Sequence, residues 1–222
     1  MNNKKLGNIG INNESRLPFS QACENNKYAI LKVLKKELVG YSRVLEVGSG
    51  TGQHSVYFAA HLPHLLWQTS DVSANHHIIQ AWHEAYPSPN LQAPLKFDLT
   101  IDSIISSEEG KAYDAVFTAN TLHIIAWSLV QRLFELVGKA LCYNSKFIIY
   151  GPFNENGFYT SASNQSFDLS LRQRDPNSGI RNKEEIISLA KKHFLVLDCE
   201  YQMPANNQIL VFKKSKSLDF VE

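Results

Sequence analysis

The chain alternates between short apolar runs of strand length and longer segments with apolar residues at helical spacing. Seven runs of seven to nine residues, rich in β-branched and aromatic side chains, predict strands. Pro94 removes a backbone donor from the third run, which leaves the start of that strand the least defined. The seven runs are residues 43–49, 65–71, 91–99, 113–120, 146–153, 194–202 and 208–214.

Helices are expected between most of these strands. Leucine, isoleucine and valine recur at three- and four-residue spacing, which places them on one face of a helix. Ser73 is the expected cap of the third helix. The expected helices are residues 23–39, 52–62, 74–86, 125–141 and 183–192.

This alternation predicts an α/β protein with one doubly wound, mostly parallel seven-stranded sheet and helices on both faces. The last two strands have no helix between them, so they are expected to form an antiparallel hairpin at one edge of the sheet. Residues 151–182 follow the fifth strand without clean periodicity, and they are too long for a plain connection.

Composition adds bounds to this picture. The 222 residues suit a single domain over residues 1–222, and 44% of them are hydrophobic. A net charge of +1 gives no reason to expect a nucleic-acid partner. Cys23, Cys142 and Cys199 are odd in number and far apart, which indicates reduced thiols rather than disulfides or a zinc site. The chain starts without an apolar leader and has no run that could cross a bilayer. We therefore expect a cytoplasmic protein with no membrane partner, and its oligomeric state stays open.

The segment VLEVGSGTGQHS, residues 44–55, carries the main chemical signal. It places glycines at 48, 50 and 52 directly after the first strand. Glycines there let backbone N–H groups and a helix N-terminus approach a ligand closely. A dinucleotide fingerprint would read GxGxxG, but Gln53 stands where its last glycine is required.

The pattern Glu-x-Gly-x-Gly-x-Gly resembles the signature turn of class I S-adenosylmethionine-dependent methyltransferases. The resemblance implies a Rossmann-like fold, S-adenosylmethionine as cofactor and S-adenosylhomocysteine as product. Asp71 ends the second strand, where a carboxylate can accept both ribose hydroxyls, or can cap the next helix. Asp98 matches the position that accepts the adenine amino group, although it can also simply turn the chain. The cofactor-binding residues implied are Glu46, Gly48, Ser49, Gly50, Gly52, Asp71, Val72, Asp98, Leu99 and Asn120.

Within that class, "YGPF" and "FD.SLR.RDP..GIR" resemble a small uncharacterised branch found in bacteria and animals, whose substrate is not defined. "RLPFSQACENNKYAI" also resembles that branch, and it implies that residues 1–22 fold over the cofactor. Residues 151–182 are expected to form a substrate lid inserted after the fifth strand. Its candidate substrate residues are Phe153, Asn154, Tyr159, Arg172 and Arg174, with an arginine–aspartate network that only closes the loop as the alternative.

His123, three residues after Asn120, is the candidate general base, and packing against the next helix is the alternative. The sequence contains no persuasive metal site. The favoured function is methyl transfer from S-adenosylmethionine to a small molecule. A catalytically silent cofactor-binding module that acts through partners is the first alternative, and an NAD-dependent oxidoreductase is the second.

Overall fold

The computed structural model describes residues 17–102 and 110–216, and all structural statements refer to these residues. Seven strands form one sheet in the order β3-β2-β1-β4-β5-β9-β8. Strands β1 to β5 are parallel, and β9 is antiparallel to both β5 and β8. The predicted sheet and its edge hairpin are therefore confirmed. The strands are β1 Arg43–Val47, β2 Leu66–Asp71, β3 Leu91–Lys96, β4 Ala115–Ala119, β5 Lys146–Gly151, β8 Leu195–Met203 and β9 Asn207–Lys214.

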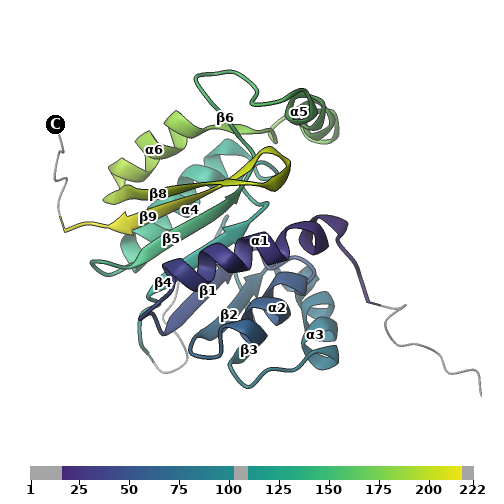
Figure 1. Ribbon diagram of the computed structural model, residues 1–222, viewed down its shortest axis with the longest axis vertical. Coiled ribbons are helices and arrows are strands. Elements are labelled where there is room, and N and C mark those ends of the chain that lie inside the picture. Colours follow the sequence, from purple (N-terminus) through teal and green to yellow (C-terminus); the bar gives the residue numbers. More distant parts are fainter. Residues whose placement is uncertain (1–16, 103–109, 217–222) are drawn as a thin grey trace, which may run out of the picture.

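Helices cover both faces of this sheet (Figure 1). Ile30, Leu34 and Phe58 bring α1 and α2 onto one face, in a buried cluster with Trp67 and Phe117 of the sheet. A second buried cluster packs α4 and α6 onto the other face. The described helices are α1 Gln21–Glu37, α2 Gln53–His61, α3 His76–Ala85, α4 Trp127–Ala140, α5 Ala162–Arg174 and α6 Lys183–Lys192.

The third strand begins at Leu91 as predicted despite Pro94, whereas the third helix begins later than predicted. Pro94 lies in β3, an edge strand, where its missing donor costs no ladder bond to a further strand, and the β2–β3 register shifts between Gln68 and Ser70. Ser73 does not cap α3, because residues Ser73–Asn75 form a short 3₁₀ turn and α3 begins at His76. No helix in the described part of the chain is long and apolar enough to cross a membrane.

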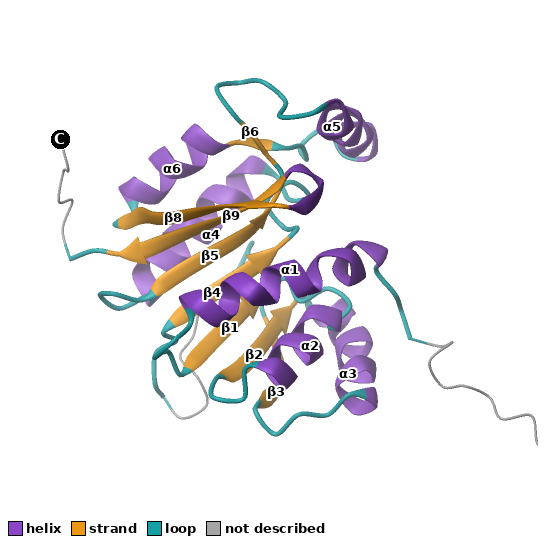
Figure 2. Ribbon diagram, in the orientation of Figure 1, coloured by secondary structure: helices purple, strands orange, loops and turns teal. Residues whose placement is uncertain are grey.

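The segment after β5 contains a helix that the apolar pattern does not predict. The residues of α5 that are buried are Asn164, Asp168 and Leu171, so its inner face is largely polar. Ser161 caps it by accepting from the backbone N–H of Asn164 at 3.1 Å. Two short strands, β6 Phe153–Asn154 and β7 Arg181–Asn182, pair in parallel at the base of this segment. Figure 2 shows α5 beyond the carboxyl end of β5, away from the two helical layers.

Gly138 gives a test of how α4 packs. A Cβ at this position would stand 2.6 Å from Cβ of His193 and 2.8 Å from its carbonyl oxygen. Alanine at 138 gains roughly 1 kcal/mol of helix propensity, but overpacking of this kind costs about 1–3 kcal/mol. We expect Gly138→Ala to lower the midpoint of thermal unfolding. Lys139→Ala at the neighbouring exposed position is the control, and it should change the midpoint little.

Candidate functional site

In the glycine turn between β1 and α2, one glycine faces open space and another packs closely against a neighbouring helix. Gly50 has φ +59°, and a Cβ built there meets no atom within 4 Å. A Cβ on Gly52, at φ +84°, would instead stand 3.2 Å from Cα of Ile79 in α3. Gly50 therefore leaves its backbone open to an approaching group, whereas Gly52 allows close packing between α2 and α3.

Gly50 faces a cleft of about 430 Å³ at the carboxyl edge of the parallel strands. Its walls come from the turns after β1, β2, β3 and β4, and from the N-terminal end of α1. The cleft brings together eight of the ten residues expected to hold the cofactor. These eight are Gly48, Ser49, Gly50, Asp71, Val72, Asp98, Leu99 and Asn120.

Asp71 ties the end of β2 to the glycine turn. Its Oδ2 accepts the backbone N–H of Gly50 at 2.8 Å. Its Oδ1 accepts from the backbone N–H of Val72 and from the side chain of Asn75, both at 2.8 Å. A carboxylate offers about four acceptor positions, so Oδ2 has room for one further donor. A second ribose hydroxyl would have to replace Asn75.

Asp98 follows β3 on the same edge of the sheet. Its Oδ1 accepts from the backbone N–H and the hydroxyl of Thr100, at 2.9 and 2.6 Å. The hydroxyl bond is the main reason why the pKa of Asp98 is lowered. Asp98 therefore does turn the chain, as the alternative interpretation held, and it is also one of the residues that line the cleft. Phe97 and Leu99 add apolar surface on either side of it.

Two of the ten residues expected in the cleft, Glu46 and Gly52, do not line it. Glu46 is 2% exposed and lies behind the turn. Its Oε2 accepts from Oγ of Ser55 at 2.5 Å and from Nε1 of Trp67 at 2.8 Å. Burial raises the pKa of Glu46 to about 7. In this structure the acidic residue of the motif joins β1, β2 and α2 beneath the glycine turn.

The start of α1 forms a wall of the cleft that sequence reasoning did not assign residue by residue. Ser20, Ala22 and Cys23 line it, and the backbone N–H of Ser20 donates to Oε1 of Gln53 at 2.5 Å. His54 also lines the cleft, and its Nε2 lies 2.6 Å from Oδ1 of Asn26 in α1. The expectation that residues 1–22 cover the cofactor lies largely outside the described residues.

His123 is 5% exposed and is not among the described residues that line the cleft. Its ring packs edge-on against Phe167 of α5, with centroids 5.4 Å apart. Burial, aided by the nearby charge of Arg181, lowers the pKa of His123 to about 4. The imidazole is therefore neutral near pH 7 and faces the segment after β5.

A buried carboxylate organises residues 151–182. Asp168 of α5 is fully buried and accepts from the hydroxyl of Tyr159, Nε of Arg172 and the backbone N–H of Ile180, at 2.8, 2.8 and 2.6 Å. Burial acts to raise the pKa of Asp168, but the bonds from Arg172 and Tyr159 outweigh it and the pKa is lowered. This is an arginine–aspartate network of the kind that the alternative interpretation described.

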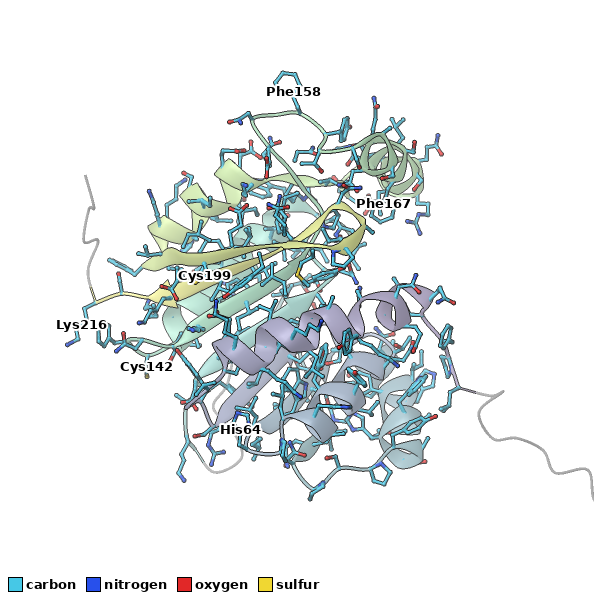
Figure 3. All side chains as sticks on the ribbon, viewed as in Figure 1. His64, Cys142, Phe158, Phe167, Cys199 and Lys216 are labelled. Atoms are coloured by element: carbon cyan, nitrogen blue, oxygen red, sulfur yellow. The ribbon has the colours of Figure 1, made fainter. Side chains whose placement is uncertain are left out.

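Arg181 joins this segment to the turn after β4. Its guanidinium donates to the carbonyl oxygens of Leu122 and Ile125, at 3.1 and 2.6 Å. The backbone N–H of Gly179 also donates to the carbonyl oxygen of His123, at 2.8 Å. Phe158 and Phe167 mark the segment in Figure 3, at the end of the molecule away from His64 and Cys142. The segment is thus fastened beside the cleft.

A second, polar cavity of about 350 Å³ lies under this segment. Three of the five expected substrate residues line it: Asn154, Tyr159 and Arg172. Phe153 is 1% exposed and belongs to the core beneath α4 and α6. Arg174 is exposed on α5, where its Nε donates to the carbonyl oxygen of Ser170 at 3.4 Å. Of the five expected substrate residues, the structure therefore brings together only Asn154, Tyr159 and Arg172.

Comparison with solved structures identifies the fold. Human N-acetylserotonin methyltransferase in complex with S-adenosylmethionine superposes with a TM-score of 0.75 and 12% identity, over 88% of this chain and 53% of that one. An O-methyltransferase family 2 protein from Planctomyces limnophilus in complex with apigenin gives 0.76 and 15%, over 87% and 58%. This chain therefore has the Rossmann-like class I methyltransferase fold. It spans somewhat more than half the length of these proteins.

A family comparison places the sequence more closely than these distant structural likenesses do. The match runs over residues 17–214, which is nearly the whole described part of the chain and includes both cavities. The chain therefore belongs to the DUF938 family, which is described as a family of proteins of unknown function.

Proposed function

We propose that this protein is an S-adenosylmethionine-dependent methyltransferase that binds its cofactor in the 430 Å³ cleft. The observation that carries the proposal is the open backbone of Gly50, next to the Asp71 carboxylate and in the same cleft as Asp98. Two of the solved structures with this fold are described as complexes with S-adenosylmethionine and S-adenosylhomocysteine, which supports the same ligand here.

The residues present fit such a cofactor. Asp71 retains acceptor capacity on Oδ2 for a ribose hydroxyl, and one oxygen of Asp98 is not engaged by Thr100. Phe97, Leu99 and Ile124 offer apolar surface for an adenine ring. Asn120 holds a positive φ of 56° at the end of β4, a conformation that asparagine tolerates better than most residues. We assign the methionine end of the cofactor to this turn.

When bound, the cofactor supplies a methyl group on an already activated sulfonium, so the protein's task is alignment in a dry site. The glycine turn and Asp71 would bind and orient it. Ser20, which caps α1, and Cys23 would cover the cleft on one side, and Ile124 and Ile125 would exclude water on the other. We propose that residues 151–182 act as the lid that takes a small-molecule acceptor. The complex with apigenin is an example of a small ligand on this fold.

His123 as a general base stays a prediction. Its burial against Phe167 and its absence from the described wall of the cleft favour a packing role. The same observation favours a second candidate function, a cofactor-binding protein without turnover. Binding of S-adenosylhomocysteine with no methyl transfer to a broad panel of small acceptors would support that second candidate.

Isothermal titration with S-adenosylhomocysteine, with NAD as the parallel ligand, tests the proposal. We expect micromolar binding of S-adenosylhomocysteine and none of NAD. Gly50→Val should weaken this binding at least about 100-fold, because a side chain would fill the open position. Gly40→Val is the matched control, since Gly40 also has positive φ and open space but lies between α1 and β1. Binding of NAD alone would contradict the proposal.

Asp71 should contribute to affinity through a charged hydrogen bond. Such a bond is worth about 1.5–3 kcal/mol, so Asp71→Ala should weaken binding of S-adenosylhomocysteine by roughly 10- to 100-fold. Asp114→Ala is the control, because Asp114 also accepts two backbone N–H groups, at 2.7 and 3.0 Å, next to β4. Equal affinities of the Asp71 variant and the parent would place the ribose elsewhere.

The pKa of His123 gives a prediction that does not depend on any ligand. Because the folded pKa, about 4, lies below the ordinary value of 6.5, the unfolded chain binds the proton more readily between these values. His123 therefore stabilises the fold above pH 6.5, and this contribution is lost as the pH falls toward 4. NMR titration of its ring should show a neutral imidazole at pH 5.5. A midpoint near 6.5 would mean that His123 is open to solvent.

A further inference from the structure

The polar cavity under the lid has no residue in common with the described wall of the cofactor cleft. It lies between the lid and the first residues of α4 and α6, because Trp127 and Glu185 both line it. Its volume of about 350 Å³ is within the range of small-molecule sites. Arg181 lines this cavity and donates to the carbonyl oxygen of Ile125, which lines the cleft, at 2.6 Å, so the two cavities are neighbours.

Asn154 is the first sign that the cavity holds a ligand. The residue is 9% exposed, and its side-chain carbonyl oxygen is buried with no hydrogen-bond partner among the described residues. Leaving a buried polar group unpaired costs stability. Asn154 lines the cavity, and a ligand N–H or O–H that met this oxygen after a small movement of the amide would remove that cost. Asn154 therefore calls for a donor on the ligand.

Two arginine residues line the cavity, and each has N–H donors that no described residue accepts. Arg172 is bound through Nε to Asp168, and neither of its terminal nitrogens has an acceptor within the described ranges. Arg181 uses Nε and Nη2 on three carbonyl oxygens, and its Nη1 is not engaged by the described residues. The planar nitrogens of arginine match the two oxygens of a carboxylate. These two arginines therefore indicate a ligand that carries a carboxylate.

The position of Arg172 is fixed by close packing. A Cβ on Gly179 would stand 2.3 Å from a terminal nitrogen of Arg172 and 2.9 Å from Oδ1 of Asp168. Only a glycine backbone can lie this close to the ion pair, and Gly179 has φ +142°. The guanidinium is thus held by contacts within the chain, and such preorganisation lowers the entropy cost of binding.

The charges around the cavity balance. Arg172 and Arg181 carry two positive charges, and Asp168 and Glu185 carry two negative ones. Glu185 lines the cavity and acts on the charge of Arg181. A dianion such as phosphate would leave this group of charges unbalanced, whereas a zwitterion suits it.

We propose that this cavity binds a small zwitterionic amino carboxylate. Its carboxylate lies at Arg172 and Arg181, and its ammonium group donates to the carbonyl oxygen of Asn154 and faces Glu185. As the methyl acceptor, this ligand rests on the proposed function, but its binding does not. The proposal thus assigns a substrate class to the lid.

Isothermal titration of the full chain with each of the twenty standard α-amino acids tests the proposal. We expect at least one to bind, and its analogues without the amino group or without the carboxylate to bind at least about 10-fold more weakly. Inorganic phosphate is titrated in parallel. The proposal is overturned if no amino acid binds at about 10 mM. It is also overturned if phosphate or the deaminated acid binds as tightly as the amino acid.

Variants separate a binding role from a structural one. Asn154→Leu should weaken binding of the amino acid at least about 10-fold, yet leave the midpoint of thermal unfolding unchanged or higher, because it removes an unpaired buried polar group. Glu185→Gln should weaken binding of the amino acid but not binding of its deaminated analogue. Glu184→Gln, on the same turn of α6, is the control. Arg172→Gln should weaken binding of both the amino acid and its deaminated analogue. Arg174→Gln, at an exposed position of α5, is the control. Unchanged affinity in Asn154→Leu would overturn the assignment of the ammonium group.

Titration of the same preparation with S-adenosylhomocysteine keeps the two proposals apart. Binding of S-adenosylhomocysteine without any amino acid supports the cofactor cleft and overturns the amino carboxylate site. Binding of an amino acid without S-adenosylhomocysteine supports the site and overturns the proposed methyl transfer.

Discussion

The parallel arrangement of β1 to β4 is the constraint on which the rest of this site depends. Because these strands run in the same direction, the four turns that follow them meet at one edge of the sheet. The chain passes from β1 outward to β3 and then returns to the other side of β1 as β4. Such a reversal leaves a crevice between the two connections, which is where ligands bind in sheets of this kind. The 430 Å³ cleft lies there.

Short polar contacts then fix the details of the cleft. The Asp71 carboxylate bonds the glycine turn and its own following residues, and Ser70 accepts the backbone N–H groups of Gly48 and Ser49 through its carbonyl oxygen. Glu46 holds α2 and β2 from behind through Ser55 and Trp67. The glycine turn is therefore organised by hydrogen bonds within the chain.

Residues 151–182, which we propose to act as the lid, are stabilised differently from the sheet. Their helix α5 buries Asn164 and Asp168 rather than a row of apolar side chains, and the carboxylate of Asp168 accepts three hydrogen bonds there. Buried polar groups are tolerated when they are paired, and Asp168 is paired on every side. Asn154 is the contrasting case, since its carbonyl oxygen is buried and unpaired. Asp168 thus belongs to the hydrogen-bonded framework of residues 151–182, whereas Asn154 is the residue that we propose for ligand binding.

By itself the sequence determined the sheet, the edge hairpin and the glycine turn, because apolar periodicity and the spacing of Gly48, Gly50 and Gly52 are local properties. The resemblance of the glycine turn to class I methyltransferases implied the cofactor residues, and eight of these line the cleft at the ends of parallel strands. Only the tertiary structure showed that Glu46, His123 and Phe153 are buried, because burial depends on what packs against a residue from elsewhere in the chain. The tertiary structure also revealed helix α5 in residues 151–182, because a helix whose inner face is polar has no apolar periodicity in the sequence. Tyr159, Arg172 and Ile180 contact Asp168 only once the chain has folded.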